Sequence, residues 1–246
     1  MMSGPCITIV FDNDPGVPGL TSLWGFAALI EEGDRTILFD TGSNGRVLLR
    51  NMADLGLAPD AIDVVFLSHA HWDHIGGLDS VLELSPQATV VVHQGFSKHL
   101  IRDLQGLCGS VVVVGQEPVS LGLGAFSTGM LESDPAEQAL VLETLGLSVV
   151  ISGCAHAGIA QLVARATNLL ERKIDWALGG FHLMDADASA IGRSISALQG
   201  LGVRDLVPIH CTGDLAKAAC RDAFGPHCHA GGVGRRFAFA DGRLAG

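Results

Sequence analysis

Tyrosine is absent from the 246-residue chain, and aromatic residues make up only 5% of it. Charged residues are also scarce, at 17%, and 26 acidic residues outnumber 15 basic ones, which gives a net charge of −11. An acidic surface repels phosphate backbones, so we expect no general nucleic-acid binding. Hydrophobic residues make up 48%, which favours a folded chain with a sizeable core and excludes the composition of a disordered one.

Neither a signal peptide nor a membrane span is visible. The sequence opens without a basic region followed by a long apolar run. The longest apolar stretches, such as Val111–Val114, are too short to cross a bilayer, so we expect no membrane partner. The six cysteines form no CxxC pair and no small disulfide scaffold. Reduced thiols in a cytoplasmic protein are the simplest interpretation.

Short apolar segments recur along the chain, each bounded by Gly, Pro, Asp or Asn. Several are apolar throughout, which is typical of strands covered on both faces. The predicted strands are Ile7–Phe11, Gly25–Ile30, Thr36–Phe39, Val64–Leu67, Thr89–Val92, Val111–Val114, Ala139–Leu142, Leu147–Ile151, Trp176–Leu178, Asp205–Val207 and Arg236–Ala240.

Helical patterns lie between these strands, the clearest being an apolar stripe of period 3.6 in Gly158–Arg172. The other predicted helices are Arg46–Leu55, Gly95–Leu104, Asp187–Gln199 and Thr212–Phe224. Since no linker and no repeat divides the chain, we predict a single domain over residues 1–246, built from layers of sheet and helix. The Gly-rich stretch 115–135 is interpreted either as a loop flanking a site or as two short strands and turns.

Four potential metal ligands stand together in "SHAHWDHIGGL", directly after a predicted buried strand. They are His69, His71, Asp73 and His74. Residues two apart point the same way in an extended chain, and residues three apart meet on a helical turn, so a strand that turns into a helix can aim all four at one point. Imidazole and carboxylate ligands suit zinc, with iron or manganese as alternatives. A solvated polar loop does not explain this ligand spacing.

Three further histidines follow apolar strands elsewhere in the chain. His156 follows "LSVVISGCA", His182 follows "DWALGGF", and His210 follows "DLVPI". Each by itself fits a buried core histidine equally well. Together they are typical of distant ligands brought to one edge of a sheet.

The chain resembles the metallo-β-lactamase superfamily. "ILFDTG", "LSHAHWDHIGGL", "SGCAHAG" and "PIHCTG" occur in that family's order, and the resemblance runs from Ile7 to about Phe239. It implies an α/β fold, a four-layer αββα sandwich, with a metal site at one end. It also implies that His69, His71 and His156 hold one metal, and that Asp73, His74 and His210 hold a second. Asp40 is implied to be a buried carboxylate that orients the site; the alternative is an Asp that merely shapes a turn.

One motif departs from the family pattern. Most two-metal members carry a bridging Asp after the strand that corresponds to Trp176–Leu178, whereas this chain has "GGFHL" there. Either His182 replaces that acid, or the second metal is weak or absent, or His182 contacts substrate or shuttles protons. The motifs together are similar to the branch labelled dihydropterin-ribofuranosylaminobenzene-phosphate synthase-like, which implies a pterin-linked phosphate substrate.

The superfamily resemblance implies a zinc-dependent hydrolase, with one or two Zn²⁺ ions. Zinc lowers the pKa of bound water to about 7, and the resulting hydroxide would attack a small, anionic ester, phosphodiester or lactone. Asp73 would orient that hydroxide and take its proton. The alternatives are a non-hydrolytic pterin-phosphate synthase-like enzyme, a metal-binding sensor domain, and an iron redox protein, which is disfavoured because flavodiiron relatives carry Glu where this chain has His71.

Two cysteines adjoin proposed ligands. Because neighbouring residues in a strand point to opposite faces, we expect Cys154 and Cys211 to pack inward. The alternative, a thiol that touches the metal, rests on the preference of zinc for thiolate. The expected partner is a small-molecule substrate, and the sequence leaves the substrate's identity and the oligomeric state open.

Overall fold

The predicted apolar segments pair into two β-sheets in the computed structural model, which describes residues 3–240 and 242–245. The chain divides into two compact units, and each sheet belongs to one of them. Unit 1 consists of residues 1–115 and 232–246, and unit 2 of residues 116–231. The single domain over residues 1–246 stays a prediction.

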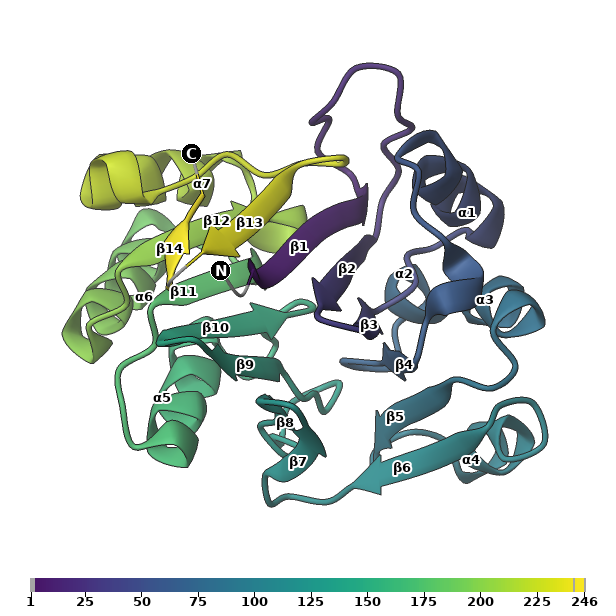
Figure 1. Ribbon diagram of the computed structural model, residues 1–246. Helices are drawn as coiled ribbons and strands as arrows, with labels where there is room; N and C mark the ends of the chain where they lie inside the picture. The colour runs from purple at the N-terminus through teal and green to yellow at the C-terminus, as the bar shows by residue number, and fades with distance from the viewer. Residues whose placement is uncertain (1–2, 241, 246) are drawn as a thin grey trace. The chain divides into compact units, whose positions relative to one another are not determined.

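The described part of unit 1 contains an eight-stranded mixed sheet in the order β14-β13-β1-β2-β3-β4-β5-β6. Strand β13, from the end part of the chain, pairs antiparallel with β1, as Figure 1 shows, while β3, β4, β5 and β6 run parallel. The strands are β1 Ser3–Asp12, β2 Phe26–Glu32, β3 Arg35–Phe39, β4 Val64–Phe66, β5 Thr89–His93, β6 Ser110–Val114, β13 Arg236–Ala240 and β14 Arg243–Leu244.

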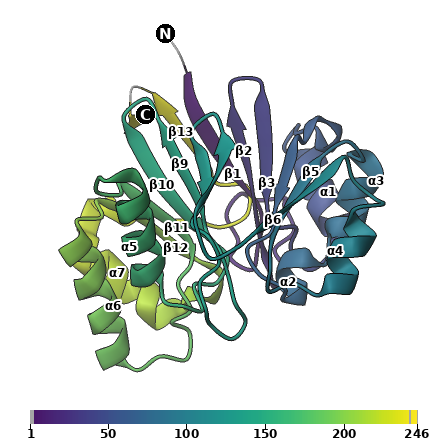
Figure 2. The same cartoon turned by 90° about the horizontal axis from the view of Figure 1, so that it is seen from below.

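Helices α1, α3 and α4 lie on one face of this sheet (Figure 2). Alternate strand residues such as Val65 and Val90 pack there against Leu48 of α1 and Val81 of α3. Helix α1 begins after Asn44, whose side chain accepts a hydrogen bond from the Val47 amide and so caps the helix. The helices of unit 1 are α1 Gly45–Asp54, α2 Trp72–Ile75, α3 Leu78–Leu84 and α4 Lys98–Leu104, with a 3-10 turn at Pro59–Ala61.

Six strands of the described residues form the sheet of unit 2, in the order β12-β11-β10-β9-β8-β7. Strands β10, β11 and β12 run parallel, and the others pair antiparallel. The strands are β7 Val119–Gly122, β8 Ala125–Ser127, β9 Leu140–Thr144, β10 Leu147–Ser152, β11 Trp176–Gly180 and β12 Asp205–Ile209. Helices α5 Ile159–Leu170, α6 Ala188–Leu201 and α7 Asp214–Phe224 lie on one face of this sheet (Figure 2), and 3-10 turns cover His210–Thr212 and Gly225–His227.

The apolar stripe predicted in α5 is the face that the helix buries. Ile159, Leu162, Val163 and Ala166 are buried and belong to the core of unit 2. Helix α6 begins after Asp187, the first residue of the predicted helix, whose side chain accepts a hydrogen bond from the amide of residue 190 at 2.7 Å and caps the helix. Burial of the apolar stripe of α5 on the sheet is the main source of that helix's stability, because isolated helices of this length are marginal in water.

Most predicted elements are confirmed to within a few residues, and three differences have local causes. The helix predicted from Gly95 begins only at Lys98, because Ser97 caps it there. Helix α3 at Leu78–Leu84 was not predicted, since two glycines precede it and mask its start. The stretch 115–135 contains two short strands, β7 and β8, which is the second of the two interpretations.

The parallel strands of each unit end at one edge, and the candidate ligands follow those ends. In unit 1, Phe39 of β3 pairs with Phe66 of β4, so Asp40 and Ser68 leave the sheet side by side. In unit 2, the C-terminal residues of β10, β11 and β12 also align. Across the residues described, none of the helices combines the length and the apolar character that a membrane crossing requires.

Candidate metal centre

The four predicted ligands of unit 1 converge where β4 turns into α2. His71 immediately precedes α2, and Asp73 and His74 lie within it. The ring of His69 lies 4.9 Å from the ring of His71 and 4.1 Å from that of His74, between centroids. His69, Asp73 and His74 are buried, while His71 is exposed. The predicted turn from strand to helix therefore brings three imidazoles and one carboxylate together.

Asp40 lies under this cluster and is fully buried. Its Oδ2 atom accepts hydrogen bonds of 2.7 Å from His74 Nδ1 and from the Ser68 hydroxyl, and its Oδ1 atom accepts one of 2.7 Å from the Ser68 amide. The Ser68 Oγ atom also lies 2.9 Å from His69 Nδ1. These contacts occupy the Nδ1 atoms of His69 and His74, so Nε2 is the atom that each ring presents to a metal. The turn-shaping alternative for Asp40 does not account for these contacts.

The donor set fits a divalent metal of the zinc type. The Nε2 atom of His74 lies 3.6 Å from the Oδ2 atom of Asp73. A tetrahedral zinc ion with ligands at about 2.1 Å separates neighbouring ligand atoms by about 3.4 Å. One nitrogen and one oxygen donor thus stand at the separation that a shared metal needs, and carboxylate support behind the imidazole is the usual outer partner of such a ligand.

Close backbone packing holds α2 in place beside Thr41. The Thr41 hydroxyl donates to the His74 carbonyl at 2.9 Å and accepts from the Gly77 amide at 3.2 Å. A Cβ atom on Gly77 would lie 2.3 Å from the Thr41 carbonyl oxygen. The φ of Gly77 is −97°, which any residue adopts. The close approach of the Thr41 backbone, and not the backbone conformation, is therefore the reason for glycine at this position.

The three distant histidines all follow strands of unit 2, as predicted. His156 comes after β10, His182 after β11 and His210 after β12. The rings of His156 and His182 lie 4.2 Å apart between centroids. His182 and His210 both have φ of 51°, a left-handed conformation that is uncommon for residues other than glycine and that gathers at functional sites.

Glu137 supports the loop that carries His156. Its carboxylate is buried and accepts a hydrogen bond from the Ala157 amide at 3.2 Å. The assignment of His69, His71 and His156 to one metal, and of Asp73, His74 and His210 to a second, draws on both units and stays a prediction.

Two thiols lie among the histidines of unit 2. The ligand atoms of Cys154, His156 and His182 lie within 4.8 Å of one another, and so do those of Cys154, His210 and Cys211. Both thiols are buried, as predicted. Strand alternation does not apply, because β10 ends at Ser152 and Cys211 lies in a 3-10 turn.

Cys211 and His182 shift each other's protonation. The pKa of Cys211 is held well below its ordinary value, chiefly by a hydrogen bond with the Cys154 side chain. A hydrogen bond with His182 lowers this pKa further, and burial opposes both effects. The same contact with Cys211 raises the pKa of His182 above its ordinary value, and burial opposes it. The Glu137 and Asp185 charges add to the rise. Both shifts act in the direction of the charged forms of Cys211 and His182.

No side chain fits where the family pattern has its bridging acid. A Cβ atom on Gly180 would lie 2.4 Å from the Gly153 carbonyl oxygen and 2.6 Å from the Cys211 sulfur. On Gly179, whose φ is +125°, it would lie 2.0 Å from the Ser152 carbonyl oxygen. The backbones that follow β10 and β11 are thus so close at these glycines that neither position has room for an acidic side chain.

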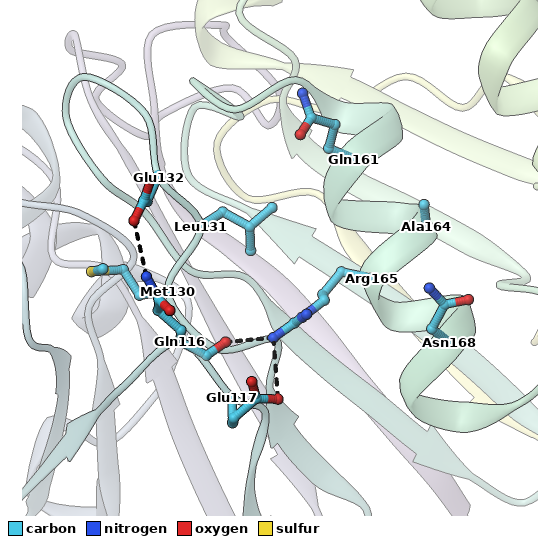
Figure 3. Close-up of a pocket in the computed structure, with 9 residues that line it drawn as sticks. All are labelled: Gln116, Glu117, Met130, Leu131, Glu132, Gln161, Ala164, Arg165 and Asn168. Atoms are coloured by element: carbon cyan, nitrogen blue, oxygen red, sulfur yellow. Dashed lines mark hydrogen bonds and ion pairs between the residues drawn. The ribbon is translucent and has the colours of Figure 1, made fainter.

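A separate pocket of about 470 Å³ in unit 2 lies beside α5, and none of the predicted ligands lines it (Figure 3). Arg165 crosses it, donates to the backbone carbonyl of Gln116 and has Glu117 3.6 Å from its guanidinium (Figure 3). Arg165 also donates to the backbone carbonyl of Thr128 at 3.1 Å. The arginine charge is thus already used to hold the chain's own backbone. This arrangement stabilises the fold and is not the expected setting for metal chemistry.

Sequence reasoning missed three residues near the candidate ligands. Ser68 and Glu137 carry no signal beyond being polar residues next to strands. Trp72 stands between two predicted ligands in the sequence, and its side chain is 62% exposed, the largest exposed aromatic surface in the described residues. An aromatic residue inside a ligand motif is a signal that could have marked it as a substrate contact.

The sequence profile of the metallo-β-lactamase superfamily matches residues 25–210, which is most of the chain. The protein belongs to this superfamily. The matched range contains the motifs that follow β3, β4, β10 and β11 and ends at His210, directly after β12. The predicted fold class, the α/β metallo-β-lactamase fold, is confirmed together with the family.

Individual relatives cover much of the chain. It is 28% identical over 235 residues to the 7,8-dihydropterin-6-methyl-4-(β-D-ribofuranosyl)-aminobenzene-5′-phosphate synthase of Methanocaldococcus jannaschii, with 77% of this chain and 80% of that protein covered. A crystal structure described as a metal-dependent hydrolase of the β-lactamase superfamily is 25% identical, with a TM-score of 0.78 over 94% of this chain and 98% of the other. Human tRNase Z, short form, shares the fold at 13% identity, with a TM-score of 0.62 over 94% of this chain and 98% of the other.

Proposed function

We propose that this protein is a metal-dependent hydrolase that acts on a small, anionic ester, phosphodiester or lactone. The observation that carries the proposal is the arrangement of His74 between two carboxylates, with Asp40 2.7 Å from Nδ1 and Asp73 3.6 Å from Nε2. Asp40 fixes the ring, and Asp73 offers an oxygen donor beside the nitrogen that faces the metal. Structural histidines have no need of this double arrangement.

A divalent metal supplies Lewis-acid activation of water and of the substrate oxygen when it is bound. We propose that this metal is Zn²⁺. The residues that would bind it are His69, His71, Asp73, His74, His156 and His210. Asp73 takes the proton that the attacking water loses, because its carboxylate lies among the donors and is almost completely buried. His182 is exposed beside His156, and we assign to it contact with the substrate or return of a proton to the leaving group.

The experiment begins with metal analysis of the purified protein and of His71→Ala. His71 is exposed, so its removal disturbs the packing less than removal of His69 or His74. We expect zinc in the parent protein, less metal in the variant, and loss of hydrolysis across a panel of phosphodiesters, esters and lactones. Full activity with unchanged metal content in His71→Ala would remove the site assignment. Two iron ions per chain, with a visible absorption that changes on reduction, would contradict a zinc hydrolase and indicate a redox protein.

A second candidate is a non-hydrolytic synthase that works on a pterin and a phosphate-bearing fragment. The relative from Methanocaldococcus jannaschii favours it, because that protein's name describes a synthase of such a compound. Water labelled with heavy oxygen separates the two reactions. A hydrolase incorporates the label into its product, whereas a synthase joins two fragments without it. A metal-binding sensor domain would bind the metal and show neither reaction.

A further inference from the structure

Two sets of candidate ligands in unit 2 share one residue, Cys154. The first set is Cys154, His156 and His182, and the second is Cys154, His210 and Cys211. Within each set the ligand atoms lie within 4.8 Å of one another. The Cys154 side chain is only 4% exposed, so its sulfur lies inside the protein among these imidazoles. A residue common to two ligand sets holds the position that a bridging ligand needs.

Carboxylate is excluded from the neighbouring backbone position. Gly180 has no room for a side chain, because a Cβ atom there would meet the Gly153 carbonyl oxygen and the Cys211 sulfur. The Cys211 thiol in turn lies 3.5 Å from the Cys154 carbonyl oxygen, to which it donates. The volume next to β11 is thus filled by the loop 153–155 and by sulfur.

Thiolate is a stronger zinc ligand than carboxylate and brings one negative charge, as the missing acid would. We propose that Cys154 is a metal ligand of this protein, at the point where the two sets meet, and that it replaces the bridging carboxylate of the family pattern. This inference rests on the proposed function, because it requires that the centre binds metal. Cys211, which belongs to the second set only, is the comparison residue.

The test uses the full chain loaded with Zn²⁺ and compares the parent protein with Cys154→Ser, Cys211→Ser and Cys220→Ser. Cys220 is a matched control, since it is a buried thiol of α7 whose pKa burial raises to about 12. Zinc X-ray absorption should show sulfur at about 2.3 Å in the parent protein and in Cys220→Ser. In Cys154→Ser we expect that sulfur signal to fall by at least half. Zinc affinity should fall by about 100-fold or more, because loss of an outer partner alone costs about 10- to 100-fold.

A second measurement needs no variant. The parent protein is treated with a thiol-alkylating reagent with and without Zn²⁺, and the modified cysteines are located by mass spectrometry. Because Cys154 is buried, the reaction is run in enough urea for buried thiols to react in the chelated protein. Cys154 should then react more slowly with zinc than without it, whereas the buried Cys220 should react equally in both states. Equal reactivity of Cys154 in both states overturns the inference, even if the serine variant fails to fold.

The remaining outcomes separate the two proposals. Zinc bound through nitrogen and oxygen alone overturns the role of Cys154 and leaves the proposed function standing. A full sulfur signal in Cys154→Ser that disappears in Cys211→Ser also overturns it, since the sulfur ligand is then the other thiol. A parent protein that binds no divalent metal overturns this inference together with the proposed function.

Discussion

The Nδ1 atom of His74 lies 2.7 Å from the Oδ2 atom of Asp40, and both side chains are completely buried. A buried carboxylate must have its oxygen atoms paired, and Asp40 achieves this with His74 and with the hydroxyl and amide of Ser68. Asp40 itself has φ of 54°, so the chain accepts an uncommon backbone conformation to place this carboxylate. Strain of this kind is expected where the position of a side chain matters for function.

Asp40→Asn should weaken metal binding by about 10- to 100-fold, because the amide cannot accept from His74 and both Ser68 donors as the carboxylate does. It should also lower the free energy of unfolding by about 1–3 kcal/mol, since a buried donor loses its partner. Metal titration and urea unfolding measure the two effects. Asp79→Asn, at an exposed position in the first turn of α3, is the control and should change neither. Unaltered metal affinity in Asp40→Asn would mean that Asp40 only shapes a turn.

Trp72→Ala should raise KM more than it lowers kcat. The Trp72 side chain is 62% exposed although its neighbours in sequence, His71 and Asp73, are proposed ligands, so its ring is available to a flat or apolar part of the substrate. Metal content should stay unchanged, and Trp72→Phe should recover most of the affinity because it keeps an aromatic face. Steady-state kinetics on any substrate found in the panel, together with metal analysis, checks this. A fall in kcat with KM unchanged contradicts a binding role.

His182→Ala separates the roles left open for this residue. If His182 is a ligand, the variant loses metal; if it contacts substrate, metal stays and KM rises. We expect the second result, because the His182 side chain is exposed whereas His210 is completely buried. The measurement is metal content beside kcat and KM. Unchanged metal and unchanged kinetics would remove His182 from the site.

Gly180→Ala should destabilise the protein by about 1–3 kcal/mol, because the new Cβ atom would overlap the Gly153 carbonyl oxygen and the Cys211 sulfur. Gly192→Ala is the matched control. Gly192 lies at an exposed position in α6, and a Cβ atom there meets nothing within 4 Å. That variant should be more stable by about 0.5–1 kcal/mol, the usual gain of Ala over Gly inside a helix. Urea unfolding of both variants tests the contrast, and equal stabilities would show that the backbone at Gly180 can relax.

Asp205→Asn should lower stability at neutral pH, and the loss should vanish in acid. Burial acts to raise the pKa of Asp205, but hydrogen bonds from Arg204, His229 and His227 outweigh it, and the pKa is lowered. A carboxyl with a lowered folded-state pKa stabilises the protein above its unfolded pKa of about 3.9, and this contribution disappears as the pH falls through the folded value.

Urea unfolding at several pH values measures the difference between the parent protein and this variant. We expect about 1–3 kcal/mol at neutral pH, which is the usual cost of losing buried hydrogen bonds to a charged group. The difference should shrink below pH about 4. A difference that is constant over this range would show that packing alone is lost. His229 is a further readout, because its ring stacks 4.5 Å from that of Trp176 and depends on the contact with Asp205.

Local patterns in the chain were sufficient to predict most of the elements and the cluster of four candidate ligands in unit 1. Apolar period and cap residues, such as Asp187 before α6, act over a few neighbouring residues and are therefore readable from sequence. The same holds for His69, His71, Asp73 and His74, because all four stand on one strand-to-helix turn whose geometry the spacing determines.

Tertiary structure alone decided the hydrogen bonds and close contacts around the candidate ligands within each unit. Ser68 binds Asp40 across 28 residues of sequence, and the clash at Gly180 involves Gly153 and Cys211, which no local pattern connects. The burial of Cys154 and Cys211 was predicted, but strand alternation does not explain it, because the chain leaves the strands just before both residues. Ligand types and their spacing are properties of the sequence, whereas hydrogen-bond partners and excluded volume arise only when distant strands pair and bring their ends to one edge.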